Sequence, residues 1–202
     1  MAQGFTHPFA IPLPSNQGGT GLTSPGANGN VLTSNGTIWT STAPAASSKV
    51  IQIVNIETGA VATGTTQIPI DDTPPQNTEG DQYMSLAITP ASATNKLRID
   101  VVTFSTSSVI TVGVIQIAAL FQDSTANALA CGWSNSAYAA VSVLPSQISF
   151  SHIMTAGTIS ATTFKVRIGA SAVATTTFNG FAGARLFGGV LASSITITEY
   201  IP

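Results

Sequence analysis

Four carboxylates fall close together in one proline-rich stretch, and such clusters can bind calcium or cleave glycosidic bonds. They are Asp71, Asp72, Glu79 and Asp81. Their order lacks the alternating Asp pattern of a helix–loop–helix calcium site, and neighbours on one loop do not define the fixed separation of a glycosidase pair. We expect a solvated turn in which Asp71 or Asp72 accepts turn hydrogen bonds. A calcium site is the alternative, and the sequence predicts no metal and no cofactor.

The side chains suited to nucleophilic catalysis are few and isolated. The histidines are His7 and His152, and Cys131 is the single cysteine, so no intrachain disulfide can form. No nucleophile-elbow motif surrounds any serine. We expect His152 to be a core or interface residue and Cys131 to be a buried structural thiol. The sequence therefore predicts a protein that is not an enzyme.

An uncharged stretch over residues 132–146 is the best candidate for a contact surface. It presents Trp133 and Tyr138 among Ser, Ala and Asn135. Aromatic rings stack on sugar faces and supply rigid area at low entropic cost, while Asn and Ser add adaptable hydrogen bonds. We expect Trp133, Asn135 and Tyr138 to contact a receptor. The alternative is that Trp133 is a core residue at the end of a strand.

The composition excludes several partners and points to self-association. Charged residues make up 7% of the chain, against about 25% in typical soluble proteins. The net charge of −2 offers no basic footprint for nucleic acid, no apolar run is long enough to span a membrane, and no secretory signal is recognisable. A surface with so few charges is best covered by other copies of the chain. A monomer with a Ser/Thr/Asn surface is the alternative.

The first 48 residues contain no Lys, Arg, Asp or Glu. Such a segment has too little apolar area to order itself, so we expect other chains to order it. Its best local signal is an Asn35-Gly36 pair between two β-forming runs, which predicts a hairpin with a two-residue loop. A lone hairpin is marginal in water and needs neighbours. Residues 41–48 are typical of a linker.

Residues 49–202 lack helical periodicity and are rich in Val, Ile and Thr, which predicts an all-β domain. Polar and apolar residues alternate cleanly from Lys96 to Val101 and from Phe164 to Ile168, as in strands over a core. Many short strands with turn signals favour a jelly-roll-like β-sandwich. The expected strands are 50–57, 60–70, 82–89, 96–105, 109–122, 127–133, 147–155, 161–170, 175–181, 184–191 and 194–201.

The strand expected over 109–121 is apolar on both faces, with Ile110, Val112 and Val114 on one and Ile115, Ile117 and Phe121 on the other. In a two-layer sandwich the outer face would be wet, so we expect a neighbouring protomer to cover it. The predicted interface residues are Ile110, Val112, Val114, Ile115 and Ile117. The alternative is a loop or terminal segment of the same chain folded over that face.

Two distinctive motifs follow one another near the N-terminus. Residues 13–24, Leu-Pro-Ser-Asn-Gln-Gly-Gly-Thr-Gly-Leu-Thr-Ser, look like the Leu-Pro-x-x-x-Gly-Gly-Thr-Gly-x-Thr repeat of bacteriophage tail fibre proteins. Residues 25–41, from Pro-Gly-Ala-Asn-Gly to Trp-Thr-Ser, are similar to a widespread phage fibre and tail-collar pattern. Residues 70–81 are similar, more loosely, to distal domains that follow this pattern.

The resemblance implies a short homotrimeric fibre in the virion, assembled in the bacterial cytoplasm. It would join a tail or baseplate protein through its N-terminus and bind a host surface glycan or outer-membrane protein. The alternatives are a fibre-borne polysaccharide depolymerase and a purely structural tail or collar protein that binds no receptor.

The expected organisation follows from these segments. Residues 1–24 attach to the tail, residues 25–48 form an intertwined hairpin, shaft and linker, and residues 49–202 form the distal receptor-binding sandwich. For attachment we expect Phe5, His7 and Phe9 to enter a tail socket, because aromatic anchors in desolvated pockets carry much of a binding energy. The alternative is that attachment begins at the Gly-Gly-Thr-Gly turn.

Overall fold

The computed structural model describes residues 19–24, 26–44, 49–109, 111, 113–135, 137–138 and 142–202. The chain divides into two compact units, Met1–Ser47 and Ser48–Pro202. The tail-attachment candidates Phe5, His7 and Phe9 lie outside the described residues.

The smaller unit contains the expected hairpin. Strand β1 (Val31–Ser34) pairs antiparallel with β2 (Trp39–Thr42). The turn is centred one residue later than predicted, because Asn35 N–H donates to the carbonyl of Ile38 and Gly36 takes the positive φ of +90°. Asn35 contributes through its side chain instead, since its Oδ1 accepts the N–H groups of Thr37 and Ile38. The central pair is therefore Gly36-Thr37, with glycine at the position that requires positive φ.

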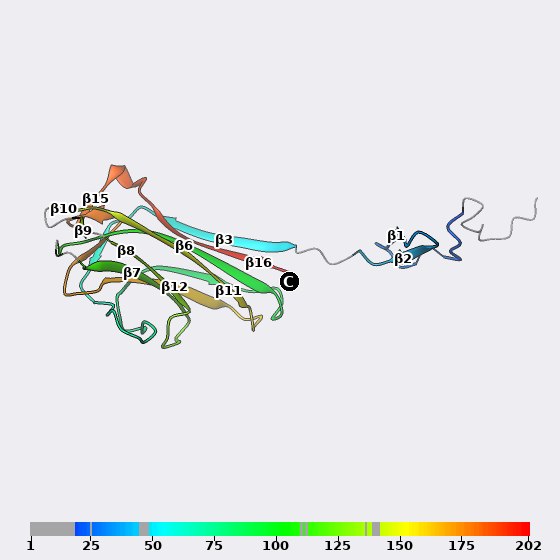
Figure 1. The fold of residues 1–202 in the computed structure, drawn as a ribbon, viewed down its shortest axis with the longest axis horizontal. Helices are drawn as coiled ribbons and strands as arrows, with labels where there is room; N and C mark the ends of the chain where they lie inside the picture. The colour runs from blue at the N-terminus through cyan, green and yellow to red at the C-terminus, as the bar shows by residue number, and fades with distance from the viewer. Residues whose placement is uncertain are drawn as a thin grey trace, which may run out of the picture. The chain divides into compact units, whose positions relative to one another are not determined.

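The larger unit is built from two antiparallel sheets (Figure 1). The first sheet contains, in spatial order, β3 (Val50–Thr58), β16 (Ser193–Tyr200), β6 (Lys96–Ser107) and β11 (Ser146–Thr155), extended by β13 (Thr176–Phe178) and β4 (Ala62–Gly64). The second sheet contains β5 (Asp81–Ile88), β12 (Thr162–Ala170), β7 (Ile115–Gln122) and β8 (Ala130–Asn135). In each sheet a strand from later in the chain lies between two earlier strands: β16 lies between β3 and β6, and β12 lies between β5 and β7. This strand order is typical of a jelly roll. The predicted all-β jelly-roll-like sandwich is confirmed.

The core lies between the two sheets and follows the predicted alternation. On β6, Leu97, Ile99 and Val101 are buried, and on β12 the buried residues include Phe164 and Ile168. Because alternate side chains of a strand point to opposite faces, Arg98 and Asp100 face outward and form a surface salt bridge of 3.0 Å.

Three expected strands are much shorter than predicted, and the 175–181 run is divided into β13 and the two-residue strand β14 (Gly180–Phe181). The 60–70 run forms a strand over Ala62–Gly64 and then leaves the sheet. The 109–122 run becomes a strand at Ile115, because Gly113 has a φ of +95° and Val114 N–H closes a turn onto Thr111. The 184–191 run forms the two-residue strand β15 (Ala184–Arg185) and then a 3₁₀ turn, η3 (Phe187–Gly189).

The outer face of β7 is covered in part by the chain itself. Ile68, on the segment between β4 and β5, packs with Ile117, Ala119 and Phe121. Val114 packs with Ala170 and Ala174. Val114 and Ile117, two of the predicted interface residues, are therefore largely buried within one chain, and their contact with a second protomer stays a prediction. Ile115 is half-buried, and Ile110 and Val112 lie outside the described residues.

The sandwich has two distinct ends. At one end, here called the Lys49 end, the carbonyl of Lys49 accepts the N–H of Ile201, and Tyr200 pairs with Val50 and Lys96. Strand β6 then runs the length of the domain to Ser107, which pairs with Thr176 at the opposite end. Within the sandwich, this Ser107 end lies opposite the start of β3 (Figure 1).

Candidate functional site

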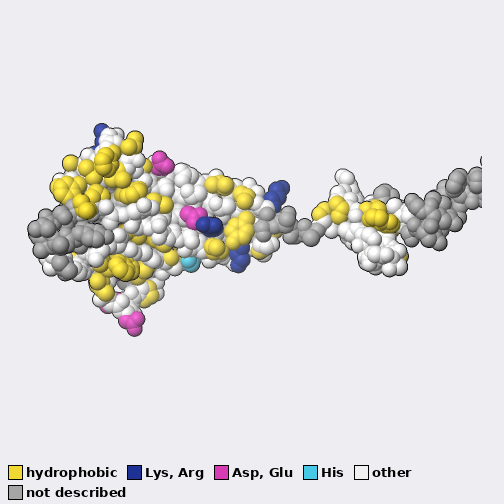
Figure 2. Space-filling model, turned by 45° about the horizontal axis from the view of Figure 1, so that its top comes forward, with side chains coloured by type: hydrophobic (Ala, Val, Ile, Leu, Met, Phe, Trp, Pro, Cys, Tyr) yellow, Lys and Arg dark blue, Asp and Glu magenta, His cyan; other side chains and the backbone are white. Residues whose placement is uncertain are grey.

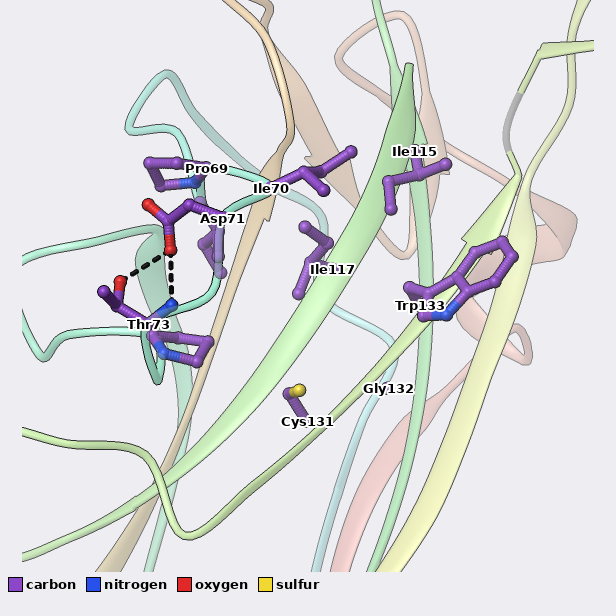
Figure 3. A pocket seen from close by; sticks show the side chains of 11 residues that line it. Pro69, Ile70, Asp71, Thr73, Ile115, Ile117, Cys131, Gly132 and Trp133 are labelled. Atoms are coloured by element: carbon purple, nitrogen blue, oxygen red, sulfur yellow. Dashed lines mark hydrogen bonds between the residues drawn. The ribbon is translucent and has the colours of Figure 1, made fainter. Parts of the chain in front are cut away.

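A largely apolar groove lies on the outer face of the second sheet (Figure 3). Its volume is about 390 Å³. One wall is the segment before β5, the floor is β7, and the other wall is β8. The lining residues are Ile68, Pro69, Ile70, Asp71, Thr73, Pro75, Ile115, Ile117, Cys131, Gly132 and Trp133. We call this surface the Trp133 groove.

Strand β8 presents its functional side chains by alternation. Cys131, Trp133 and Asn135 point outward and are exposed, and Trp133 has 66% of its surface accessible. Gly132 faces inward, where a Cβ would come within 2.9 Å of Phe150. The alternative that Trp133 belongs to the core is therefore wrong. The expectation of a buried Cys131 is also wrong, because the close approach of β11 at Gly132 turns Cys131 to the outer face.

The structure brings together residues that sequence reasoning had assigned to separate roles. Trp133 pairs directly with Ile117 across the β7–β8 ladder, and Asn135 pairs with Ile115. Both pairs lie toward the Ser107 end, since the neighbouring Gln116 accepts a hydrogen bond from Thr176. Tyr138 lies on the short strand β9 (Ala137–Tyr138), which pairs with β10 (Ser142–Val143). The side chain of Tyr138 lies outside what the structure describes.

The acidic residues are separated into three local hydrogen-bonding arrangements. Asp71 Oδ1 accepts the backbone N–H and the hydroxyl of Thr73, at 2.8 and 2.6 Å. Hydrogen bonds from the Thr73 side chain and backbone lower the pKa of Asp71. Glu79 accepts the N–H of Gln76, and Asp81 accepts the N–H and the hydroxyl of Thr66.

These contacts agree with the predicted turn at Asp71. Asp72 is exposed. Within the described part of the chain, no three His, Cys, Asp or Glu side chains are grouped so that they could hold a metal ion.

The side chains that line the groove are suited to binding a ligand or a partner molecule. Aliphatic side chains from the segment before β5 and from β7 form one wall and the floor, the indole of Trp133 on β8 lies at the rim, and the carboxylate of Asp71 stands beside the groove. Concave apolar sites with a few polar groups are typical of ligand and partner recognition. Sequence reasoning found Trp133 but missed the wall at Ile68–Pro75, which comes from a distant part of the chain. The available signal was the pair Pro69 and Pro75, which line this wall.

A buried carboxylate was also missed by sequence reasoning. Glu199 is fully buried on β16, on the same face as Ile195 and Ile197. Its carboxylate accepts hydrogen bonds from the side chains of Gln52 and Asn95 and from the N–H groups of Ala91 and Ser92. Burial raises the pKa of Glu199, but these hydrogen bonds outweigh it and lower the pKa below its ordinary value. These hydrogen bonds connect β16 with β3 and with the segment between β5 and β6 at the Lys49 end of the sandwich.

Comparisons with known proteins identify no family. No protein-family profile and no curated protein matches the chain. Among solved structures, the Eiger TNF of S. frugiperda has 8% identity and a TM-score of 0.41, with 73% of this chain and 92% of that chain covered. A structure of infectious bursal disease virus, Gx strain, has 8% identity and a TM-score of 0.33 over 84% of this chain and 44% of that one. The VP2 subviral particle of the same virus has 11% identity and a TM-score of 0.33, over 83% and 40%.

Two of these three structures are of virus particles. Because the TM-scores are low, the fold assignment depends on the strand order of this chain. In the described parts of the chain, no helix has the length and apolar character needed to span a membrane.

Proposed function

We propose that this chain is a structural, non-enzymatic component of a phage virion, a short homotrimeric tail fibre that attaches to the bacterial surface. The fibre-like motifs of residues 13–41 support the tail location. The uncharged N-terminal segment supports assembly with a tail or baseplate protein. The receptor is a host surface glycan or outer-membrane protein.

The exposure of Trp133 is the observation that carries this proposal. Its indole is 66% accessible beside an apolar groove, and it lies toward the Ser107 end of the sandwich, away from the Lys49 end at which β3 begins. A fibre held by its N-terminus presents that end to the host. Large exposed aromatics at concave apolar sites are typical binding anchors.

Competition for adsorption tests the proposal. Purified full-length chain is incubated with host cells before the phage that carries this fibre is added, and the adsorption rate is measured. We expect the wild-type chain to slow adsorption. Trp133→Ser should weaken the competition roughly 30-fold, since an aromatic anchor contributes about 2 kcal/mol. Trp39→Ser, in the exposed hairpin of the other unit, is the matched control and should compete as the wild type does.

Other results would support the alternatives. A wild-type chain that is incorporated into virions but does not compete would indicate a tail or collar protein without receptor binding. Release of reducing ends from host envelope polysaccharide by the purified chain would indicate a depolymerase.

A further inference from the structure

A second apolar surface stands on the opposite sheet. Residues 180–190 form an arm made of β14 (Gly180–Phe181), β15, η3 and Val190. Phe187 and Val190 have 72% and 84% of their surfaces exposed, and Phe181 is also exposed. Among the described residues of the larger unit, Phe187 and Val190 are two of the three most accessible large hydrophobic side chains, and they lie within four residues of each other.

The base of this arm is fixed by buried hydrogen bonds, whereas Phe187 and Val190 at its tip are exposed to solvent. Asn179, which is fully buried, donates to the carbonyl groups of Thr58 and Ala60 and accepts the hydroxyl hydrogen of Ser193. Thr106 donates to the carbonyl of Gly180. A projection that is already fixed loses little conformational entropy when it binds, so the arm is suited to docking.

The arm cannot fill the Trp133 groove of its own chain. Its base joins β6 and β13 of the first sheet, whereas the groove lies on the outer face of the second sheet. Both features nevertheless lie toward the Ser107 end of the domain, with β15 on one side of the sandwich and β7 and β8 on the other (Figure 1). Figure 2 shows hydrophobic side chains gathered in two places at this end.

The two surfaces are complementary in size and charge. A cavity of about 150 Å³ is enough to hold a benzene ring, so a groove of about 390 Å³ has room for the side chains of Phe187 and Val190. The arm carries one cation, Arg185, and the rim of the groove carries Asp71 with the exposed Asp72 after it. Among the described residues, none of these three charges takes part in a salt bridge.

We infer that the arm of one copy, through Phe187 and Val190, docks into the Trp133 groove of a second copy, with Arg185 facing Asp71 and Asp72. This contact is head-to-tail, because it joins two different surfaces, and such contacts close into rings when the rotation between copies allows it. Trp133 then lies beside the neighbouring arm, so the contact surface at this end combines residues of two chains. The inference does not depend on the proposed function.

The single native cysteine makes the contact testable by cross-linking in the full-length chain. Cys131 is exposed and lines the groove. A cysteine placed on the arm by Val190→Cys should come within disulfide range of Cys131 in the next copy, which requires Cα atoms about 4.4–6.8 Å apart. Under mild oxidation we expect most of this variant to form intermolecular disulfides, resolved on non-reducing gels and mapped to positions 190 and 131 by mass spectrometry.

Two controls separate this docking from non-specific oxidation. Ile159→Cys introduces a cysteine at another highly exposed hydrophobic position, 66% accessible, in the turn between β11 and β12 and away from the arm. It should cross-link far less than Val190→Cys. Adding Cys131→Ser to Val190→Cys should remove the cross-link. Equal cross-linking of the Val190 and Ile159 variants, or a disulfide mapped between two copies of position 190, would overturn the inference.

The oligomeric state gives a second measurement that needs no disulfide. The double variant Phe187→Ser with Val190→Ser should sediment at the chain mass of 20.5 kDa at concentrations where the wild type sediments at a multiple of it. Circular dichroism should show an unchanged β fold, since both side chains are exposed. A folded double variant that keeps the wild-type assembly would contradict docking through the arm.

Discussion

Strand β1 of the hairpin has no buried side chain, whereas β6 of the sandwich buries a side chain at every second position from Leu97 onward. The hairpin is folded by contacts close in sequence, such as the Asn35 side chain on the N–H of Thr37. The sandwich is folded by pairs distant in sequence, such as β3 with β16. The sandwich can therefore be stable through its own core, while the hairpin leaves Leu32 and Trp39 exposed.

The largest expected effect on the free energy of unfolding is a loss at a buried site of the sandwich, to be compared with an exposed site of the hairpin. Phe164→Ala removes a fully buried ring from the sandwich core and should lower the free energy of unfolding by about 3–5 kcal/mol. Leu32→Ala in the hairpin removes an exposed side chain and should change it by less than about 0.5 kcal/mol. Chemical denaturation of the full chain, followed by circular dichroism, measures both. Equal losses would show that the hairpin and the sandwich unfold as one body.

An intermediate loss in the free energy of unfolding is expected when Glu199, the buried carboxylate of the sandwich, is replaced. Glu199→Gln replaces an acceptor of four hydrogen-bonding groups with an amide that cannot accept them all. We expect a loss of about 1.5–3 kcal/mol in the free energy of unfolding at pH 7, as for hydrogen bonds to a charged group. Glu57→Gln, on the exposed face of β3, is the matched control and should stay within about 0.5 kcal/mol.

The same pair of variants predicts a dependence on pH. Because the pKa of Glu199 is lower in the folded state than its ordinary value of 4.5, its contribution to stability is present above pH 4.5 and is lost as the pH falls through the folded-state pKa. The difference in stability between wild type and Glu199→Gln should therefore shrink below pH 4.5. A difference that stays constant from pH 7 to pH 3 would contradict this assignment.

The smallest effect is expected in the hairpin turn. Gly36→Ala places a Cβ at a φ of +90°, where no neighbouring atom lies within 4 Å, so the cost is backbone strain of about 1–2 kcal/mol. The cross-strand contacts of Thr33 with Thr40 should weaken in NMR spectra, while the unfolding midpoint of the sandwich stays unchanged. Asn35→Asp, which keeps the side-chain acceptor, should retain the hairpin. An intact hairpin in Gly36→Ala would show that Gly36 does not set this turn.

Local patterns predicted the parts of the fold that depend on neighbouring residues. The alternation from Lys96 to Val101 and from Phe164 to Ile168 correctly predicted which side chains of these two strands face the core, because one side of each strand meets the core. The same logic failed just before Ile115, where apolar residues alternate in the sequence but Gly113 has a positive φ and the N–H of Val114 closes a turn onto the carbonyl of Thr111. It failed again at Phe187, whose φ of +48° ends the expected strand.

Features that depend on distant contacts could not be read from the sequence. Nothing near Ile68 indicates that it covers Phe121, and only the folded chain brings the Ile68–Pro75 wall opposite Trp133. Cys131 was expected inside because free cysteines are often buried, but the packing of Gly132 against Phe150 decides its direction. Glu199 alternates with Ile195 and Ile197, so its position on the core face was visible, but its four hydrogen-bond donors were not.

The bond between Lys49 and Ile201 also determines how the sandwich responds to force. The N-terminal segment continues directly into β3, which is paired along its length with β16. A pull between Lys49 and the Ser107 end therefore acts along the strands, at right angles to the hydrogen bonds of the antiparallel ladder. Those bonds are loaded together in shear and do not open one after another, so β3 is a mechanically resistant connection for a domain under tension.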